Sequence, residues 1–278
     1  MKRNPALQTN TVQTIVGVDF SGASDAGRHI WICSARPRDH DLIIEQVQPA
    51  ETLCGGSYAR DAALAALREY LSGRSGVLAG LDFPFSLPAA IIGESSYRAF
   101  VSGFAAKYGS AEAFYAACRR AGRGRELKRA TDIEAGAPFA PANLRMFRQT
   151  FYGIRDILAP LIASGGVCVV PMMAARRDRA ILIEICPAVF LRRLGLYSPY
   201  KGPASRARSA RSSLLDALRA RFRLGGLTQP IRRLIVGQTQ GDALDSVLAA
   251  VATFSAWREG RLGMAPRGDL RQIEGEIF

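Results

Sequence analysis

Residues 14–23 read TIVGVDFSGA, an apolar run that carries Asp19 close to its end and then breaks at Ser21 and Gly22. The β-branched residues, and the turn residues behind them, predict a strand over residues 14–20. A carboxylate at the tip of a buried strand is costly to desolvate unless a cation or a hydrogen-bond donor meets it there. Asp19 is therefore the first candidate for a functional side chain.

Three further motifs place carboxylates where an apolar run ends or a helix begins. They are GLDFPFSLP with Asp82, LIEICP with Glu184, and GDALD with Asp242 and Asp245. Carboxylate oxygens are ligands that suit Mg²⁺ or Mn²⁺ rather than zinc. The four motifs together indicate a site for a divalent metal.

Each carboxylate also has a purely structural interpretation. Asp19 and Asp82 each precede turn residues and can accept hydrogen bonds from turn amides. Glu184 lies in an apolar run that looks interior, where a Glu can pair with an Arg. Asp242 and Asp245 fit a capping arrangement at the start of a helix. No one of these explanations predicts the whole set of motifs, and this favours a shared site.

Composition limits the class of protein. The chain has 278 residues, of which 48% are hydrophobic, so it can bury a substantial core, and we expect a single domain over residues 12–278. Its 37 Lys and Arg residues exceed its 24 Asp and Glu residues, which gives a formal net charge of +13. Such a charge favours polyanionic partners such as nucleic acid, because binding releases counterions.

Five cysteines are scattered along the chain without CxxC spacing, so neither a zinc site nor a disulfide framework is expected. That usage favours a reducing cytoplasm. No apolar run reaches membrane-spanning length, and residues 1–11 carry early basic residues without an apolar segment behind them. We therefore expect a cytoplasmic protein with a short, loose N-terminal leader and no membrane partner.

Hydrophobic periodicity predicts an α/β fold that starts in the order strand, strand, strand, helix, strand. Pro84 and Pro88 prevent the fourth strand from continuing, and residues 84–166 are helical and basic, so we expect them to form an insertion. Two later strands, 167–171 and 180–186, are expected to form a hairpin around residues 176–179. The first four expected strands are 14–20, 29–35, 42–47 and 77–81, and the expected helices are 62–71, 97–108, 112–121, 143–163, 187–194, 205–222 and one that follows GDALD.

The ordered motifs resemble those of a known family. The series GVDFSGA, DFPFSLP, EICPAVFLRRLG and DALDSVLAAV is similar to the family called domain of unknown function 429, whose members are described as predicted ribonuclease-H-like nucleases. The likeness runs from about residue 14 to the C-terminus and includes Gln149, Thr150 and Gly153. It implies a ribonuclease-H-like mixed sheet in the order β-β-β-α-β-α-β-α, and GDALD looks closest to the Holliday-junction resolvases. Cys186 departs from the aromatic residue or His that many relatives have there.

The resemblance implies roles for the acidic side chains. Asp19, Asp82 and Asp242 or Asp245 would be metal ligands, and Glu184 would belong to the site or border it. Two Mg²⁺ or Mn²⁺ ions about 3.5 to 4 Å apart can activate a water and stabilise the leaving oxygen of a phosphodiester. Asp19 would bridge the ions, and Glu184 would orient or deprotonate the water. We therefore expect a magnesium-dependent nuclease for DNA or structured nucleic acid, with these five residues as its catalytic set.

Two basic clusters are candidates for a nucleic-acid surface. Phe147, Phe151 and Tyr152 could stack on bases, although their helical spacing favours a place in the core. A charged cluster is equally compatible with a solvated helix face. The residues expected to bind nucleic acid are Arg123, Arg125, Lys128, Arg129, Arg206, Arg208 and Arg211.

Two other functions remain open. DFSG can serve as the phosphate-binding turn of an actin-like kinase, a nucleotide-binding phosphotransferase, although the second such turn, DFPFS, lacks glycine. Alternatively, the chain binds nucleic acid without cutting it. The sequence has no GxxxxGK[ST] or GxGxxG loop, and neither His29 nor His40 lies near a Ser or Cys nucleophile motif. The choice between DNA and RNA, and between a monomer and a homodimer, is left open.

Overall fold

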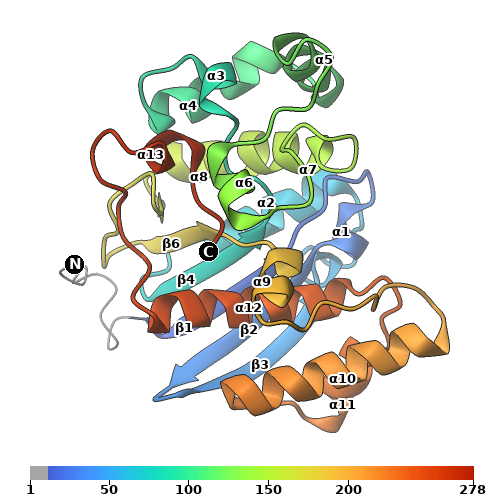
Figure 1. Cartoon of the computed structure of the whole chain (residues 1–278). Coiled ribbons are helices and arrows are strands. Elements are labelled where there is room, and N and C mark those ends of the chain that lie inside the picture. Colours follow the sequence, from blue (N-terminus) through green and yellow to red (C-terminus); the bar gives the residue numbers. More distant parts are fainter. Residues whose placement is uncertain (1–11) are drawn as a thin grey trace.

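Within residues 12–278, seven strands form one mixed sheet (Figure 1). The computed structural model describes these residues, and the loose leader expected over residues 1–11 lies outside them. The strand order is β5-β6-β4-β1-β2-β3-β7; β2 pairs antiparallel with β1 and β3, and the other neighbouring pairs are parallel. The α/β class expected from the sequence is confirmed. The strands are β1 (Thr14–Asp19), β2 (Trp31–Arg38), β3 (Asp41–Pro49), β4 (Val77–Asp82), β5 (Val167–Val169), β6 (Ala180–Glu184) and β7 (Leu224–Gly225).

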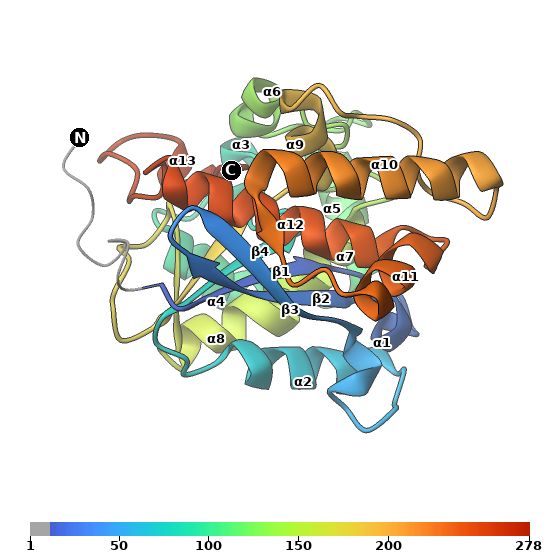
Figure 2. The same cartoon turned by 90° about the horizontal axis from the view of Figure 1, so that it is seen from below.

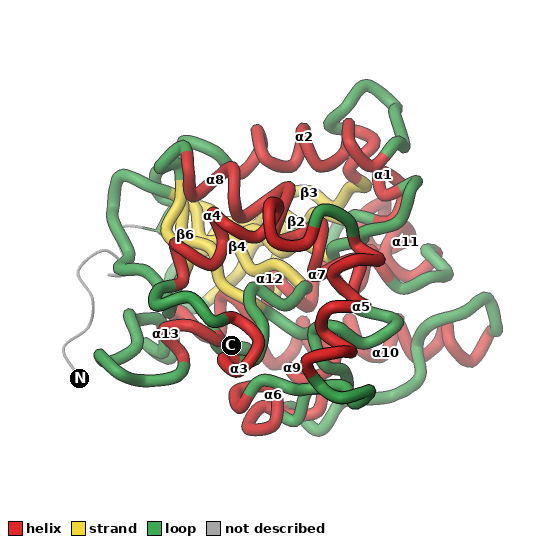
Figure 3. Tube along the Cα trace, turned by 90° about the horizontal axis from the view of Figure 1, so that it is seen from above, coloured by secondary structure: helices red, strands yellow, loops and turns green. Residues whose placement is uncertain are grey.

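Helices cover both faces of the sheet (Figures 2 and 3). One face is covered by α12 (Asp242–Arg258), with α9 (Pro187–Arg193), α10 (Ser205–Phe222) and α11 (Gln229–Gly237) beside it, and the other by α2 (Arg60–Leu71) and α8 (Ala159–Ala163). The side chains of β1 alternate accordingly, because neighbours on a strand point to opposite faces. Ile15 packs in the cluster that contains residues of α12, whereas Val16 and Val18 pack in the cluster that contains residues of α2.

Residues 84–166 are helical, as the sequence predicts. Two serines begin its longer helices: the hydroxyl of Ser96 accepts a hydrogen bond from the amide of Ala99 at 3.3 Å, and that of Ser110 from the amide of Ala113 at 3.1 Å. The segment contains α3 (Ala89–Ile92), α4 (Tyr97–Tyr108), α5 (Ala111–Ala121), α6 (Ala130–Ala135), α7 (Phe147–Tyr152), the π-helix η3 (Gly153–Leu158) and α8.

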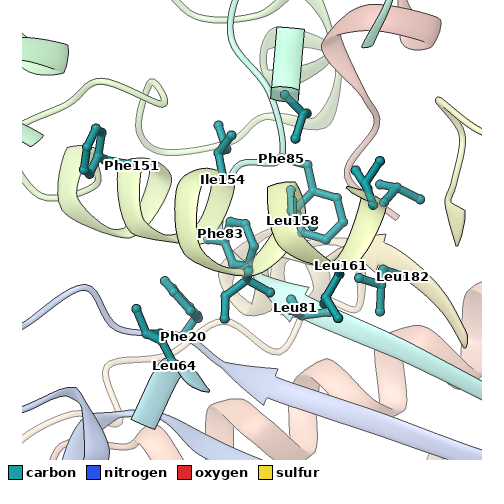
Figure 4. Packing of buried hydrophobic residues seen from close by; sticks show 14 of the residues in the cluster. Phe20, Leu64, Leu81, Phe83, Phe85, Phe151, Ile154, Leu158, Leu161 and Leu182 are labelled. Atoms are coloured by element: carbon teal, nitrogen blue, oxygen red, sulfur yellow. The ribbon is translucent and has the colours of Figure 1, made fainter. Parts of the chain in front are cut away.

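This helical segment shares its core with the sheet. Figure 4 shows Phe151 and Leu158 on the continuous run of α7, η3 and α8, with Phe20, Leu81 and Phe83 gathered beneath it. The buried side chains of both parts belong to one apolar cluster. Phe151 is fully buried, so it belongs to the core and is not available to stack on a base.

The connection between β5 and β6 differs from the expected hairpin. A hairpin would make the two strands antiparallel, but they are parallel, with Val167 opposite Ala180. β5 has only three residues. Residues 170–179 are therefore long enough to carry the chain from the end of β5 back to the edge of the sheet where β5 starts, so that β6 can begin beside Val167. The charged turn at residues 176–179 is therefore compatible with a parallel return, and the hairpin prediction was wrong.

Short elements complete the fold: α1 (Ala26–His29), the 3₁₀-helix η2 (Ala50–Thr52) and α13 (Arg271–Glu274). The C-terminal Ile277 and Phe278 are buried, and the amide of Phe278 donates to the carbonyl of Glu184 at 3.1 Å. Among residues 12–278, no helix has the length and apolar character that crossing a bilayer requires.

Candidate functional site

Asp19 and Asp82 end two neighbouring strands. They close β1 and β4, which run parallel with these two residues opposite each other. Gly17 and Gly80 are opposite each other two positions earlier. Because side chains two apart on a strand share a face, the two aspartates lie on the same face as the two glycines. That face is covered by α12, which contacts both strands.

The two glycines let α12 lie against the sheet backbone. A Cβ at Gly17 would lie 2.1 Å from the carbonyl oxygen of Ser246, and a Cβ at Gly80 would lie 1.9 Å from Oγ1 of Thr253. Only glycine fits such an approach. The contact places the first turn of α12 beside the ends of β1 and β4, where the charge of Asp245 acts on both aspartates.

Asp245 is 2% exposed and is bound through both carboxylate oxygens. The hydroxyl of Tyr200 donates to Oδ1 at 2.5 Å, and the ammonium of Lys201 lies 2.6 Å from Oδ2. Burial acts to lower the pKa of Lys201, but Asp245 and Asp19 outweigh it and raise that pKa, so the ammonium stays charged. Sequence reasoning missed Tyr200 and Lys201; their signal is the segment SPYKGP (198–203), in which two prolines flank an aromatic and a basic residue.

Asp242 faces a different set of partners. The side chain of Gln238 donates to its Oδ2 at 3.2 Å and accepts from its amide at 2.9 Å. Nδ1 of His29 lies 3.8 Å from the same carboxylate oxygen. Of the two aspartates in GDALD, it is Asp245 that lines the cleft shared with Asp19 and Asp82.

The carboxylates raise one another's pKa values. Burial, followed by repulsion from Asp245, raises the pKa of Asp82 to about 8 and that of Asp19 well above its ordinary value, and Lys201 opposes both shifts. Burial also raises the pKa of Asp242. Among the hydrogen bonds of residues 12–278, none is made to the side chain of Asp19 or Asp82, and Asp82 is partly exposed. The two neighbouring acids instead face the cleft, where a ligand or solvent can reach them.

A cleft of about 630 Å³ opens over these groups. Asp19, Asp82, Asp245 and Lys201 line it together. One side of the cleft comes from the helical segment, and the other comes from α9 and the loop that follows it. Further lining side chains include Phe139, Arg145, Met146, Gln149, Arg192 and Tyr197.

Glu184 also lines the cleft, but its carboxylate is held by Arg129. Nη1 of Arg129 donates to Oε2 at 2.7 Å, Nη2 donates to Oε1, and the amide of Phe85 donates to Oε2 at 2.9 Å. Burial raises the pKa of Glu184, while Arg129 acts to lower it. Glu184 therefore forms a buried ion pair with an Arg, which is the structural interpretation that the sequence allowed for it.

The basic residues expected on the surface divide into two groups. Arg123, Arg125, Lys128, Arg206 and Arg208 are exposed. Arg129 is 0% exposed and Arg211 is 1% exposed, which corrects the expectation that they belong to a nucleic-acid surface. Their guanidinium groups are used internally: Arg129 binds Glu184, and Arg211 donates to the carbonyl of Tyr200 at 2.7 Å and so fixes the loop that carries Lys201.

Among residues 12–278, no three or more His, Cys, Asp and Glu side chains are grouped in a way that could hold a metal ion. Both oxygens of Asp245 are bound within the protein, by Tyr200 and Lys201. Comparisons of the chain with models of known protein families, with curated proteins and with solved structures find no match.

Proposed function

We propose that the protein is a divalent-metal-dependent nuclease with a ribonuclease-H-like fold. The observation that carries the proposal is the meeting of Asp19, Asp82 and Asp245 in one cleft, from the ends of two parallel strands and the start of the helix packed across them. The order of elements supports the fold assignment: apart from the short α1 and η2, three strands, the helix α2 and a fourth strand come first, and further strands and helices follow. The exposed basic residues and the formal net charge of +13 support a polyanionic substrate.

The donor type of the three carboxylates suits Mg²⁺ or Mn²⁺, but within residues 12–278 they do not yet form a group that could hold the ion, so a bound cation would have to draw them together. All of their donors are hard oxygens, and Asp19 and Asp82 line the cleft that a cation would enter. Such a cation, when bound, supplies activation of a water and charge stabilisation for the leaving oxygen of a phosphodiester. Asp19, Asp82 and Asp245 would hold it. A cation can bind Oδ2 of Asp245 only if the ammonium of Lys201 releases that oxygen.

The other residues of the cleft position these groups. Tyr200 fixes the carboxylate of Asp245, and Gly17 and Gly80 keep α12 close to the strand ends. Lys201 is half-exposed and carries a charge that can bind a phosphate oxygen of the substrate. Glu184, which is held by Arg129 and by the amide of Phe85, supports the backbone that follows Asp82.

The kinase alternative gains no support from the DFSG turn. Gly22 is buried, and a Cβ there would lie 2.6 Å from the backbone of Arg148. The side chain of Gln149 donates to the carbonyl of Phe20 at 2.6 Å. The turn is therefore covered by the helical segment and is not open to a phosphate.

A cleavage assay tests the proposal. Labelled DNA and RNA, single-stranded, duplex and branched, would be incubated with the protein in Mg²⁺, in Mn²⁺ or in EDTA. We expect metal-dependent cleavage that falls by more than about 100-fold in Asp19→Asn and in Asp82→Asn, because each change removes a ligand. Asp178→Asn is the control, since Asp178 is exposed and pairs with Arg176. Cleavage that survives both EDTA and Asp19→Asn would disprove the mechanism.

A further inference from the structure

The carboxylates of the site are recessed. Asp19 is 8% exposed and Asp245 is 2% exposed, and both lie in the cleft of about 630 Å³. That volume is in the range of pockets that take one small ligand. A phosphate must enter the cleft to reach them. In a duplex each phosphate is held in a regular array, with the next phosphate of the same strand about 3.4 Å further along the helix axis, so one phosphate cannot enter alone.

The walls of the cleft carry two arginine–aromatic pairs. The guanidinium of Arg145 lies 5.4 Å from the ring centre of Phe139, and that of Arg192 lies 5.0 Å from the ring centre of Tyr197. All four residues line the cleft, and Tyr197 is 53% exposed. Unpaired bases stack on aromatic rings and on guanidinium planes, whereas bases within a duplex are stacked on one another.

The two walls are also joined at one point. Nη1 of Arg192, on α9, donates to the carbonyl of Gly136, just after α6, at 3.2 Å. This bond connects the segment after β6 to the helical segment, so the two walls are joined beside the cleft that Arg192 lines. A flexible single strand can adapt its backbone to such a cleft, whereas a rigid duplex cannot.

We infer that the cleft takes a single-stranded or locally unpaired segment of nucleic acid, with one phosphodiester at the carboxylates and a neighbouring base against Phe139 or Tyr197. The cleavage part of this inference rests on the proposed function. The binding part stands on the shape and lining of the cleft alone, so the two can be tested separately.

Binding is measured by fluorescence anisotropy with a labelled 12-nucleotide oligothymidine and with a hairpin duplex of the same length, in EDTA to prevent cleavage. We expect the single strand to bind at least 10-fold more tightly than the duplex. Phe139→Ala and Tyr197→Ala should each weaken single-strand binding by roughly 5- to 100-fold, which corresponds to the loss of one stacked base. Circular dichroism would establish that the variants are folded.

Tyr58→Ala is the matched control. Tyr58 is 52% exposed and lies under the guanidinium of Arg28 at 4.2 Å, but it does not line the cleft, so binding should not change. Equal binding of duplex and single strand, or unchanged binding in both cleft variants, overturns the inference. If the strand binds through Phe139 and Tyr197 but nothing is cut in Mg²⁺ or Mn²⁺, the inference stands and the proposed nuclease activity fails.

Discussion

At the scale of single residues, the ionisation of Asp82 makes the free energy of unfolding depend on pH. Its pKa of about 8 exceeds the ordinary value of 3.8, chiefly because it is buried and secondly because Asp245 is near. The folded protein therefore holds a proton that the unfolded chain releases, and the slope of stability against pH is negative between these two values. The contribution of Asp82 protonation to the free energy of unfolding is fully present below pH of about 4 and is lost as the pH rises through about 8.

We therefore expect the free energy of unfolding of the metal-free protein to fall from pH 5 to pH 8. Urea unfolding in EDTA at several pH values measures it. Asp82→Asn carries no titrating group at this position, so its stability should fall less steeply and should exceed that of the wild type at pH 8. A wild-type stability that rises over this interval, or an unchanged slope in Asp82→Asn, would contradict the assignment.

Lys201 gives a second prediction at this scale. Its ammonium occupies one oxygen of Asp245, so it competes with any cation that uses this carboxylate. Lys201→Met should therefore increase the rise in melting temperature that Mn²⁺ produces, because metal would neutralise carboxylates that no longer have a counter-charge. Thermal unfolding with and without Mn²⁺ measures the effect. Arg206→Met, an exposed change outside the cleft, should leave the Mn²⁺ response as in the wild type.

The two strand-end aspartates could be located from the sequence, but their neighbours could not. Asp19 and Asp82 follow apolar runs and precede turn residues, which is a local pattern. Lys201 lies in a loop whose position depends on Arg211 bonding the carbonyl of Tyr200, a contact between residues 11 apart that no periodicity encodes. The partner of Asp245 therefore emerges only when the chain is folded.

At the scale of elements, α12 sets the geometry of the site. Gly17→Ala would push a methyl group into the backbone of α12, where the nearest atom would lie 2.1 Å away. Because both strand and helix backbones are fixed by hydrogen bonds, we expect a loss of about 3 kcal/mol in stability and a displacement of Asp245 from Asp19. Urea unfolding and the Mn²⁺ response report the two effects.

Gly103→Ala is the matched control for this element. Gly103 lies inside α4, and a Cβ there would meet nothing within 4 Å. Alanine is the better helix former, so this variant should gain roughly 0.5–1 kcal/mol. A Gly17→Ala protein as stable as the wild type would mean that α12 can move away from the sheet without cost.

Most elements could be predicted because their patterns are local. The helix expected over residues 205–222 is α10 with the same bounds. The β5–β6 hairpin was wrong because strand direction depends on the path of the connecting chain. A pattern of two short apolar runs and a charged turn describes the strands, and it contains no information about whether residues 170–179 reverse the direction of the chain once or twice.

At the scale of the whole molecule, one buried guanidinium joins three distant parts of the chain. Arg129 precedes α6 in the helical segment; it binds Asp132 nearby, Glu184 at the end of β6, and the carbonyl of Glu274 in α13 at 2.9 Å. In the sequence Arg129 looks like one more member of a basic cluster. Its burial could not be predicted, because the carboxylate that receives it lies 55 residues away.

Removing this guanidinium should have a large effect on stability. Arg129→Met leaves Glu184 and Asp132 buried without their counter-charge, and breaking a buried pair from one side costs about 3–5 kcal/mol. Adding Glu184→Gln to that variant removes one of the uncompensated charges, so the double variant should recover part of the loss. Arg125→Met, an exposed change in the same cluster, should stay within about 0.5 kcal/mol of the wild type. Urea unfolding at pH 7.5 in EDTA compares the four proteins, and an Arg129→Met protein as stable as Arg125→Met would show that the network does not hold these three parts together.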